Sequence, residues 1–326
     1  MEKILITGAN GYLGAQLCRH LSRRGFCITG LCYPAIPDDA HWQQQFDELV
    51  VCDVRDEAKL AKIADKKFDA IIHLVSLDHH QSNDNPSFVT SVNVTPTWNL
   101  LDIFSKNGLK KFIYFSTIHV YGKNLQAAIN ENNPLQCASP YALTHYLSEN
   151  ICNYYAQNSE VKCVIARLSN SYGAPVFPDN NCWWLVVNDL CRQAWLNKKI
   201  ILQSDGSPLR DFIHGSDVCQ AVDILLQKGE NNTVYHLSSG KTYTILELAE
   251  IVQKVYRKLY GATIPVSTSA QENILDFKLF SAAPRYTVGN EKLQNVGFAP
   301  IYTIEKGIEE LFDYLEKAAN KMLGYV

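Results

Sequence analysis

Tyr141 and His145 stand four residues apart in a segment with helical character, so their side chains share one helix face. A phenol with an ordinary pKa of about 10 and an imidazole with one of about 6.5 can both exchange protons with a bound molecule. Shortly before them, residues 116–122 read STIHVYG and add the hydroxyl of Thr117 and the ring of His119. This set predicts a proton-transfer site, with a helix-face histidine beside an inert tyrosine as the plainer alternative.

A glycine-rich loop lies near the N-terminus. Residues 8–14 read GANGYLG and follow the apolar run KILIT at residues 3–7. Gly8 permits a tight strand-to-helix turn, Gly11 lets the backbone approach a pyrophosphate, and Gly14 allows close helix packing. Turn glycines are common, but this position between a terminal strand and a segment of helical period predicts a dinucleotide cradle at a helix N-terminus. A cradle and a proton-transfer pair in one chain together predict hydride chemistry.

Composition narrows the class of protein. The 326 residues, 47% of them apolar, can bury a sizeable core, and the length favours two lobes. A net charge of -3 with both signs interspersed argues against nucleic acid or a membrane surface as partner, so we expect a small-molecule ligand. We expect a cytoplasmic protein, because no secretory signal or membrane-spanning run is visible. The 10 scattered cysteines predict reduced core thiols, with no structural zinc and no metal site.

Short apolar runs alternate with amphipathic stretches through the first half of the chain. The expected strands are residues 3–7, 26–32, 50–52, 70–74, 111–115 and 161–165, and the expected helices lie near 13–21, 58–65, 92–106 and 141–157. Gly25 is the expected C-cap of the first helix. This order predicts an α/β fold, a Rossmann-type doubly wound parallel sheet. After about residue 170 the pattern becomes irregular until a final helix near 303–320, which predicts a smaller C-terminal substrate-binding lobe.

These features resemble the extended short-chain dehydrogenase/reductase family, specifically its nucleotide-sugar epimerases, dehydratases and reductases. The resemblance covers nearly the whole chain and is specific for family and fold, not for substrate. Besides the cradle it is carried by residues 73–76 (HLVS), Asn93, residues 117–122, Tyr141, residues 167–173 (RLSNSYG) and residues 210–214 (RDFIH). It implies a dinucleotide-binding Rossmann domain at 1–170 with a return segment at about 208–238, and a nucleotide-sugar-binding lobe at 171–207 and 239–326.

The resemblance also implies roles for single residues. Thr117 would bond the reacting sugar oxygen, Tyr141 would exchange its proton, and His145 would complete the catalytic set. The residues expected at the dinucleotide are Gly8, Asn10, Gly11, Tyr12, Leu13, Asp53, Val54, Leu74, Ser76, Asn93, Tyr141 and His145. Those expected at the nucleotide sugar are His80, Thr117, His119, Asn170, Arg210 and Arg285. Arginine suits the diphosphate because its planar donors engage phosphate oxygens in pairs.

NAD is the expected cofactor, with NADP not excluded. The carboxylate that often ends the second strand and holds the adenosine ribose is missing, because residues 32–34 read CYP. Arg55 or Arg24 would be the arginine to meet a 2′-phosphate, and a solvated surface charge is the alternative for each. Asp53 would bond adenine, with helix capping as its alternative.

His145 departs from the family, whose members usually place a lysine there to favour the phenolate and hold the nicotinamide ribose. Phenolate at pH 7 requires about 3 pK units, or roughly 4 kcal/mol, of electrostatic help. A histidine that is mostly neutral at pH 7 replaces that charge only in part. The sequence therefore predicts a slower or alkaline-shifted enzyme.

A second departure concerns the reaction type. Nucleotide-sugar 4,6-dehydratases of the common kind follow the threonine with Asp-Glu, whereas this chain has Ile118 and His119. Ile118 cannot donate a proton, which argues against that dehydration. His119 is either an acid or base near neutral pH or a packed strand-end residue. His79 and His80 are expected on a loop at the carboxyl edge of the sheet, as sugar contacts or as solvent-exposed residues.

The remaining expectations are less specific. Residues 180–184 (NNCWW) would contact a base or sugar or cover core, and Lys278 is the alternative to Arg285 as a second phosphate ligand. By resemblance, helices near 98–104 and 147–155 would pair into the four-helix bundle of a homodimer, although core packing would give the same apolar stripes. The leading hypothesis is NAD(P)-dependent oxidation, reduction or epimerisation of a nucleoside-diphosphate sugar. The alternative is a catalytically weakened protein that binds the cofactor or nucleotide sugar as a sensor.

Overall fold

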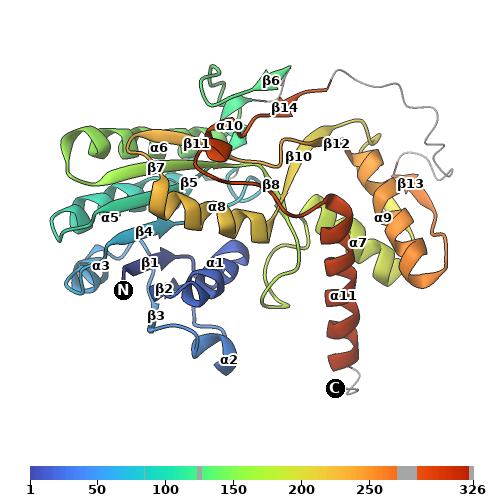
Figure 1. Cartoon of the computed structure of the whole chain (residues 1–326), viewed down its shortest axis with the longest axis horizontal. Helices are drawn as coiled ribbons and strands as arrows, with labels where there is room; N and C mark the ends of the chain where they lie inside the picture. The colour runs from blue at the N-terminus through green and yellow to red at the C-terminus, as the bar shows by residue number, and fades with distance from the viewer. Residues whose placement is uncertain (84, 123–126, 270–284, 323–326) are drawn as a thin grey trace.

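A seven-stranded parallel sheet forms the centre of the molecule, with the strand order β11-β7-β5-β4-β1-β2-β3 (Figure 1). The computed structural model describes residues 1–83, 85–122, 127–269 and 285–322. The strands are β1 (Lys3–Thr7), β2 (Cys27–Cys32), β3 (Glu48–Val51), β4 (Ala70–His73), β5 (Lys111–Thr117), β7 (Lys162–Leu168) and β11 (Thr233–Leu237). All six neighbouring pairs are parallel, so the expected doubly wound α/β fold is confirmed.

Strand side chains alternate between two buried layers, because successive residues of a strand point to opposite faces. Along β5, Ile113 and Phe115 enter the core beneath α1 and α8, whereas Phe112 and Tyr114 enter the core shared with α3, α5 and α6. The helices of these layers are α1 (Tyr12–Arg23), α3 (Glu57–Ala64), α5 (Thr95–Ser105), α6 (Pro140–Asn158) and α8 (Gly215–Lys228). Tyr114 therefore faces the helix that carries Tyr141 and His145.

Most expected elements are found with small boundary shifts. Strand β3 begins at Glu48, two residues earlier than expected, and leaves Cys52 outside the strand. The single helix expected over 92–106 is two helices, α4 (Pro86–Asn93) and α5, which meet at Val94. Pro96 explains the break, since proline has no N–H and cannot continue the preceding helix. The C-cap of α1 is Arg24, and the expected C-cap, Gly25, follows it by one residue with a φ of +87°.

The C-terminal part adds a smaller body beside the sheet (Figure 1). Its helices α7 (Val186–Asn197), α9 (Ile245–Tyr260) and α11 (Ile304–Met322) share one hydrophobic cluster. A three-stranded sheet, β12 (Thr242–Thr244), β10 (Leu209–His214) and β8 (Asn170–Tyr172), connects this body to the main sheet. The remaining elements are α2 (Ala40–Gln43), the 3-10 helix η1 (Ile118–Tyr121), α10 (Glu291–Asn295) and the pairs β9 (Ile200–Leu202) with β13 (Val266–Thr268) and β6 (Ala128–Ile129) with β14 (Thr287–Val288).

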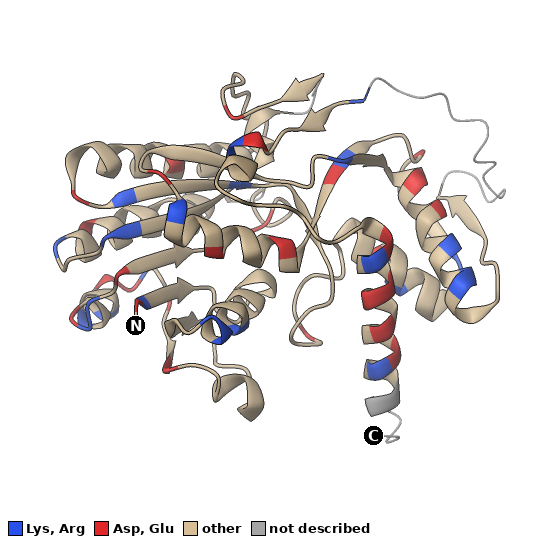
Figure 2. Ribbon diagram, in the orientation of Figure 1, with Lys and Arg blue, Asp and Glu red and all other residues tan. Residues whose placement is uncertain are grey.

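Charged side chains of both signs are scattered over the helices of both bodies (Figure 2). Among the described residues, no helix is long and apolar enough to cross a membrane. Strand β11 lies within the return segment at about 208–238 that the resemblance implied, but the sequence pattern did not predict it as a separate strand. Its residues TVYHL form an edge strand that is partly exposed at its start, so no continuous apolar run marks it.

Candidate active site

The strand order reverses between β1 and β4, and ligands of parallel sheets bind at such a switch point, outside the carboxyl ends of the strands. Two hydrogen bonds connect the ends of these strands. The Thr7 hydroxyl lies 2.7 Å from Nδ1 of His73, and the backbone N–H of Leu74 donates to Thr7 Oγ1 at 3.2 Å. The glycine loop after β1 and the segment 74–78 after β4 therefore lie on the two sides of the crevice expected at this switch point.

The geometry of the glycine loop requires its glycines. Gly8 has a φ of +71°, a conformation that L side chains rarely adopt. A Cβ at Gly14 would lie 2.0 Å from the carbonyl oxygen of Gly8, and one at Gly11 would lie 3.1 Å from it. Gly11 is also the N-cap of α1, where backbone N–H groups have no partner within the helix. This loop fits a dinucleotide pyrophosphate, as the sequence predicted.

Polar side chains support the loop from both sides. Nδ2 of Asn10 donates to the carbonyl oxygens of Tyr33, at 3.0 Å, and Ala35, at 3.2 Å, beyond the end of β2. Tyr12 donates its hydroxyl to the carbonyl oxygen of Gly173, at 3.1 Å, and Leu13 packs against the core under β1. Both polar side chains thus bond to protein backbone in this structure, and their expected contacts with the dinucleotide stay predictions.

At the far end of the crevice, Asp53 forms an ion pair with Arg55, and Nη2 of the arginine lies 2.5 Å from Oδ2 of the aspartate. Helix capping is excluded as the reason for Asp53, because the N-cap of α3 is Asp56, which accepts from the N–H of Lys59. Arg55 also interacts with the phenol of Tyr33, so it lies beside the end of β2. Arg24 instead pairs with Asp223 at the opposite end of α1, which removes it as a ligand of a 2′-phosphate.

Asn93 orients the segment after β4 relative to α6. Its Oδ1 accepts the N–H of Leu77 at 2.8 Å, and its Nδ2 donates to the Thr144 hydroxyl at 3.1 Å. Ser148, one turn further along α6, donates to the carbonyl oxygen of Asn93 at 2.9 Å. Asn93 is 1% exposed and forms all three bonds inside the protein. Asn93 therefore fixes Leu77 against α6, and its expected role on the cofactor side stays a prediction.

Thr117 and Tyr141 come together at the carboxyl end of β5. Tyr141 lies in the first turn of α6, which begins where the Ser139 hydroxyl accepts from the N–H of Ala142. Burial raises the pKa of Tyr141 to about 12, Asp78 adds to the rise, and a hydrogen bond with the Thr117 side chain opposes it. Because Thr117 Oγ1 accepts from the N–H of His119, its own hydrogen is free for Tyr141 or a ligand. The expected pair of hydroxyls is thus formed.

His145 is buried beside Tyr141, with their ring centroids 4.6 Å apart. Its Nε2 lies 3.1 Å from the Ser76 hydroxyl and its Nδ1 lies 2.9 Å from the phenol oxygen of Tyr114. Burial lowers the pKa of His145 to about 3, and the nearby His119 adds to the lowering. A ring with that pKa is neutral at pH 7, so it supplies no positive charge to Tyr141.

Two further histidines surround the phenol. The ring of His119 lies 5.9 Å from Tyr141, and that of His79 lies 6.5 Å from it. Burial lowers the pKa of His119 to about 4, and the charge of Arg210 lowers it further. His80 stands at the outer side, where Trp184 lies 5.4 Å from His79 and 5.8 Å from His80. The loops of residues 79–80 and 180–184 therefore meet above the proton-transfer site.

The expected substrate residues form a more dispersed group. Arg210 is exposed on β10 and its charge reaches His119, so it faces the crevice. Asn170 uses Nδ2 to bond the carbonyl oxygen of Asp211 at 2.9 Å. Arg285 pairs with Glu247 and donates to the carbonyl oxygen of Thr242 at 3.1 Å. Lys278, the alternative to Arg285, lies outside the described residues.

Sequence reasoning did not identify Tyr114 or the buried ion pair of Glu149 and Arg167. Arg167 donates to both carboxylate oxygens of Glu149, at 2.9 and 2.6 Å, and to the phenol of Tyr121. Glu149 lies two turns after Tyr141 on α6, and that spacing was the available signal. Tyr114 gave no signal, because an aromatic residue in an apolar strand is ordinary core.

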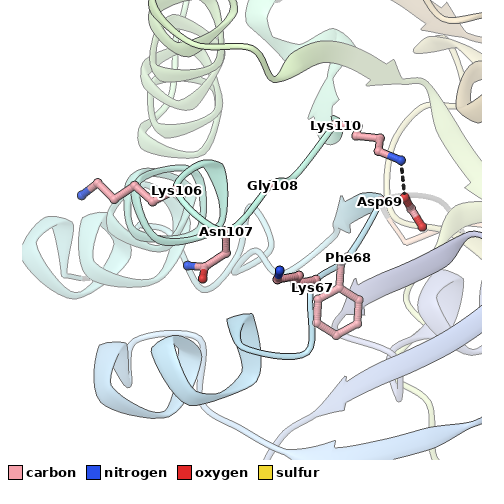
Figure 3. A pocket seen from close by; sticks show the side chains of 7 residues that line it. All are labelled: Lys67, Phe68, Asp69, Lys106, Asn107, Gly108 and Lys110. Carbon is pink, nitrogen blue, oxygen red and sulfur yellow. Dashed lines mark hydrogen bonds and ion pairs between the residues drawn. The ribbon is translucent and has the colours of Figure 1, made fainter.

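A hollow of about 570 Å³ lies at the opposite edge of the sheet, where β4 and β5 begin (Figure 3). Lysine side chains line it, and Lys110 is engaged by Asp69 at 2.8 Å. The hollow lies at the amino ends of β4 and β5, whereas the crevice lies outside the carboxyl ends of the strands, so the two are separate. Over the described ranges, no group of three or more His, Cys, Asp or Glu side chains could hold a metal ion.

Comparison with known proteins agrees with this geometry. The model of the NAD dependent epimerase/dehydratase family matches residues 4–238. A dTDP-D-glucose 4,6-dehydratase of Mus musculus is 24% identical over 333 residues, which cover 97% of this chain and 89% of that protein. A putative UDP-glucose 4-epimerase of Methanocaldococcus jannaschii is 24% identical over 315 residues, which cover 96% of this chain and 98% of that protein.

Solved structures share the fold. The UDP-glucose 4-epimerase of Thermotoga maritima, solved with UDP-glucose, superimposes with a TM-score of 0.83 at 21% sequence identity. The superposition covers 97% of this chain and 99% of that one. The second body at the C-terminal end is therefore part of the shared architecture.

Proposed function

The chain belongs to the NAD-dependent epimerase/dehydratase family, and we propose that it oxidises, reduces or epimerises a hydroxyl-bearing carbon of a nucleoside-diphosphate sugar, with NAD as cofactor. The observation that carries the proposal is the hydrogen-bonded pair of Thr117 and Tyr141 at the carboxyl end of β5, on the far side of β4 from β1. Both hydroxyls stand across the crevice from a loop that fits a pyrophosphate. Hydride chemistry at a sugar carbon needs both features.

In this proposal Tyr141 takes the proton of the sugar hydroxyl, and Thr117 donates a hydrogen bond to the same sugar oxygen. When bound, NAD supplies a hydride acceptor and, in its reduced form, a hydride donor at the sugar carbon. The phenolate is costly here, since a pKa of about 12 lies about 5 units above pH 7. The neutral His145 does not offset this cost, which supports an alkaline-shifted enzyme.

The environment of Ile118 supports epimerisation or simple redox chemistry over the common 4,6-dehydration. Ile118 is 4% exposed and packs with Val120, Tyr121 and Leu209. Its side chain is apolar, so it cannot protonate a leaving hydroxyl. His119 stands beside Tyr141, as does His79 at a slightly larger distance, and a histidine could act on a second sugar proton. A relative named as a dehydratase is therefore the weaker guide to the reaction.

We place the dinucleotide in residues 1–170 with the return segment at about 208–238, and the nucleotide sugar in 171–207 and 239–326. Arg210 is the proposed diphosphate ligand, supported by the reach of its charge to His119. Asn170 is proposed beside it, because it is anchored to the same strand through the carbonyl oxygen of Asp211. Arg285 would have to leave Glu247 to contribute a second arginine.

A homodimer through α5 and α6 is part of the proposal. The outer face of these helices exposes Trp98, Leu147 and Tyr154, which are 47%, 42% and 52% accessible, and the rings of Trp98 and Tyr154 stack at 5.9 Å. Exposed aromatic groups of this kind mark interfaces. Light scattering of Trp98→Lys tests it, with Leu196→Lys on α7, an even more exposed apolar residue, as the control. We further propose the cytoplasm as the compartment, supported by the free thiols of all ten cysteines.

The test of the function is mass spectrometry of ligands released from the purified protein, followed by incubation with a panel of nucleotide sugars in heavy water. Epimerisation without carbon-acid chemistry keeps the mass of the sugar and incorporates no solvent deuterium. Dehydration loses one water and incorporates deuterium. Oxidation changes the absorbance of added NAD. If no sugar is altered and no dinucleotide is released or bound, the proposed activity is wrong.

The sensor hypothesis is the second candidate. The observation that favours it is the neutral, fully engaged His145, which leaves Tyr141 without a positive neighbour on α6. A sensor would bind NAD or nucleotide sugar without turnover. Stereospecific product formation in the panel decides between the two, because both proteins bind the cofactor.

A further inference from the structure

A line of hydrogen bonds runs from the core through His145 to the crevice. It begins at the phenol of Tyr114, 2% exposed on β5, passes both nitrogens of His145, 3% exposed, and continues to the Ser76 hydroxyl. Ser76 in turn donates to the carbonyl oxygen of Leu77 at 2.9 Å. Three elements thus hold one ring: β5, α6 and the segment after β4.

Counting hydrogens gives one consistent direction for these bonds. The Ser76 hydrogen has an acceptor in the carbonyl oxygen of Leu77 at 2.9 Å, which leaves the Ser76 oxygen to accept from His145. In that arrangement Nε2 carries the imidazole hydrogen. Nδ1 is then an acceptor, and the phenol of Tyr114 donates to it at 2.9 Å. In the other tautomer the Ser76 hydroxyl would give up its bond to Leu77 and donate to Nε2, and Nδ1 would donate to the Tyr114 oxygen, whose own hydrogen would turn to the Ser148 side chain.

We propose that Tyr114 is a positioning residue of the active site: by donating to Nδ1 it fixes the His145 hydrogen on Nε2 and directs the one N–H of the ring to Ser76, at the cofactor side of the crevice. The role of this hydrogen bond in catalysis rests on the proposed function. Through the bond from Tyr114, the neutral ring of His145 keeps one oriented N–H donor at a position where the resembled family usually has a lysine.

The surroundings of the ring agree with a neutral, fixed tautomer. The groups nearest to it are His73 from β4, Tyr114 from β5, His119 from η1 and Tyr141 from its own helix. The carboxylate of Glu149, one turn after His145 on the same helix face, is paired with Arg167 at 2.6 Å. Burial raises the pKa of the Tyr114 phenol well above its ordinary value, so Tyr114 keeps its hydrogen.

The first test uses the unmodified protein, labelled with 15N in its histidines. Long-range proton–nitrogen correlation spectra distinguish the two neutral tautomers and the charged ring, and the His145 signal is the one lost in His145→Gln. We expect the pattern of an Nε2–H ring that stays unchanged between pH 8 and pH 6. An Nδ1–H pattern or a charged ring would overturn the proposal, whether or not any sugar is turned over.

The second test is Tyr114→Phe, which removes the donor to Nδ1 and keeps the ring in the core. We expect a mixture of tautomers in the spectrum, about tenfold weaker NAD binding and an unchanged KM for the sugar substrate. The control is Tyr235→Phe, an equally buried tyrosine at 2% exposure whose hydroxyl accepts from the N–H of Glu230 at 3.2 Å. It should leave the His145 signal and NAD binding unchanged. An Nε2–H signal that persists in Tyr114→Phe would contradict the positioning role.

Discussion

The two walls of the crevice are held in place by different means. On the β1 side, the backbone itself defines the shape: Gly8 has a φ of +71°, and Gly14 leaves no room for a Cβ. On the α6 side, side chains define it, through the bonds of Ser76, Tyr114 and Asn93. A wall made of backbone accepts no substitution of its glycines. A wall made of side chains can change a catalytic neighbour, here to His145, when its partners change with it.

The largest expected effect lies on the side-chain wall. Tyr141→Phe removes the group that exchanges the proton, and we expect kcat to fall by about 10³-fold. NAD binding should remain, because the cradle lies on the other wall. Steady-state kinetics and cofactor titration measure the two effects separately. Tyr146→Phe, on the exposed side of the same helix, is the control. Full activity of Tyr141→Phe would place the chemistry elsewhere.

Gly14→Ala is the corresponding change on the backbone wall. Its Cβ would stand 2.0 Å from the carbonyl oxygen of Gly8, so α1 must move away from the loop. We expect a loss of about 2–3 kcal/mol in the free energy of unfolding, together with loss of NAD binding. Denaturant titration with and without NAD measures both. Arg23→Ala, exposed in the last turn of α1, should change neither.

The difference between the walls also explains what the sequence could predict. The glycine spacing predicted the cradle, because backbone conformation follows directly from residue type at positions such as Gly8. The convergence of Thr117 and Tyr141 was predictable from a strand end and a helix start. Tyr114 was not, since its role depends on where a core side chain of β5 meets α6. Likewise, the sequence could not decide which of Asp53 and Asp56 caps the helix, because the two carboxylates lie only three residues apart. The local geometry makes Asp56 the cap and leaves Asp53 bonded to Arg55.

His145→Lys tests whether the missing charge limits the enzyme. A charged amine beside Tyr141 should lower the pKa of the phenol by about 1 unit or more and shift the pH–rate profile toward acid. At pH 7 the rate should rise about tenfold if the phenolate fraction limits turnover. His145→Gln, which brings no charge, is the matched control. A profile of His145→Lys that coincides with the native one would show that the phenolate is stabilised by other means.

The smallest expected effect concerns two buried histidines, one at the end of β4 and one on α6. Burial lowers the pKa of His73, bonded to Thr7, and of His145 to about 3. As pH falls below the ordinary value of about 6.5, the unfolded chain binds a proton that the folded chain refuses, so folding stability is present above that pH and is lost as pH decreases toward 3. Each ring should cost about 1 kcal/mol between pH 6.5 and pH 5.5.

His145→Gln removes one of the two histidines with a lowered pKa. The unfolding free energy of this variant should therefore change less between pH 6.5 and pH 5.5 than that of the native protein. The exposed His41→Gln is the control and should retain the native dependence. Urea titrations at pH 7.5, 6.5 and 5.5 measure the difference. An equal loss in native protein and His145→Gln would mean that His145 accepts a proton while folded, and a charged ring in that place would help Tyr141 after all.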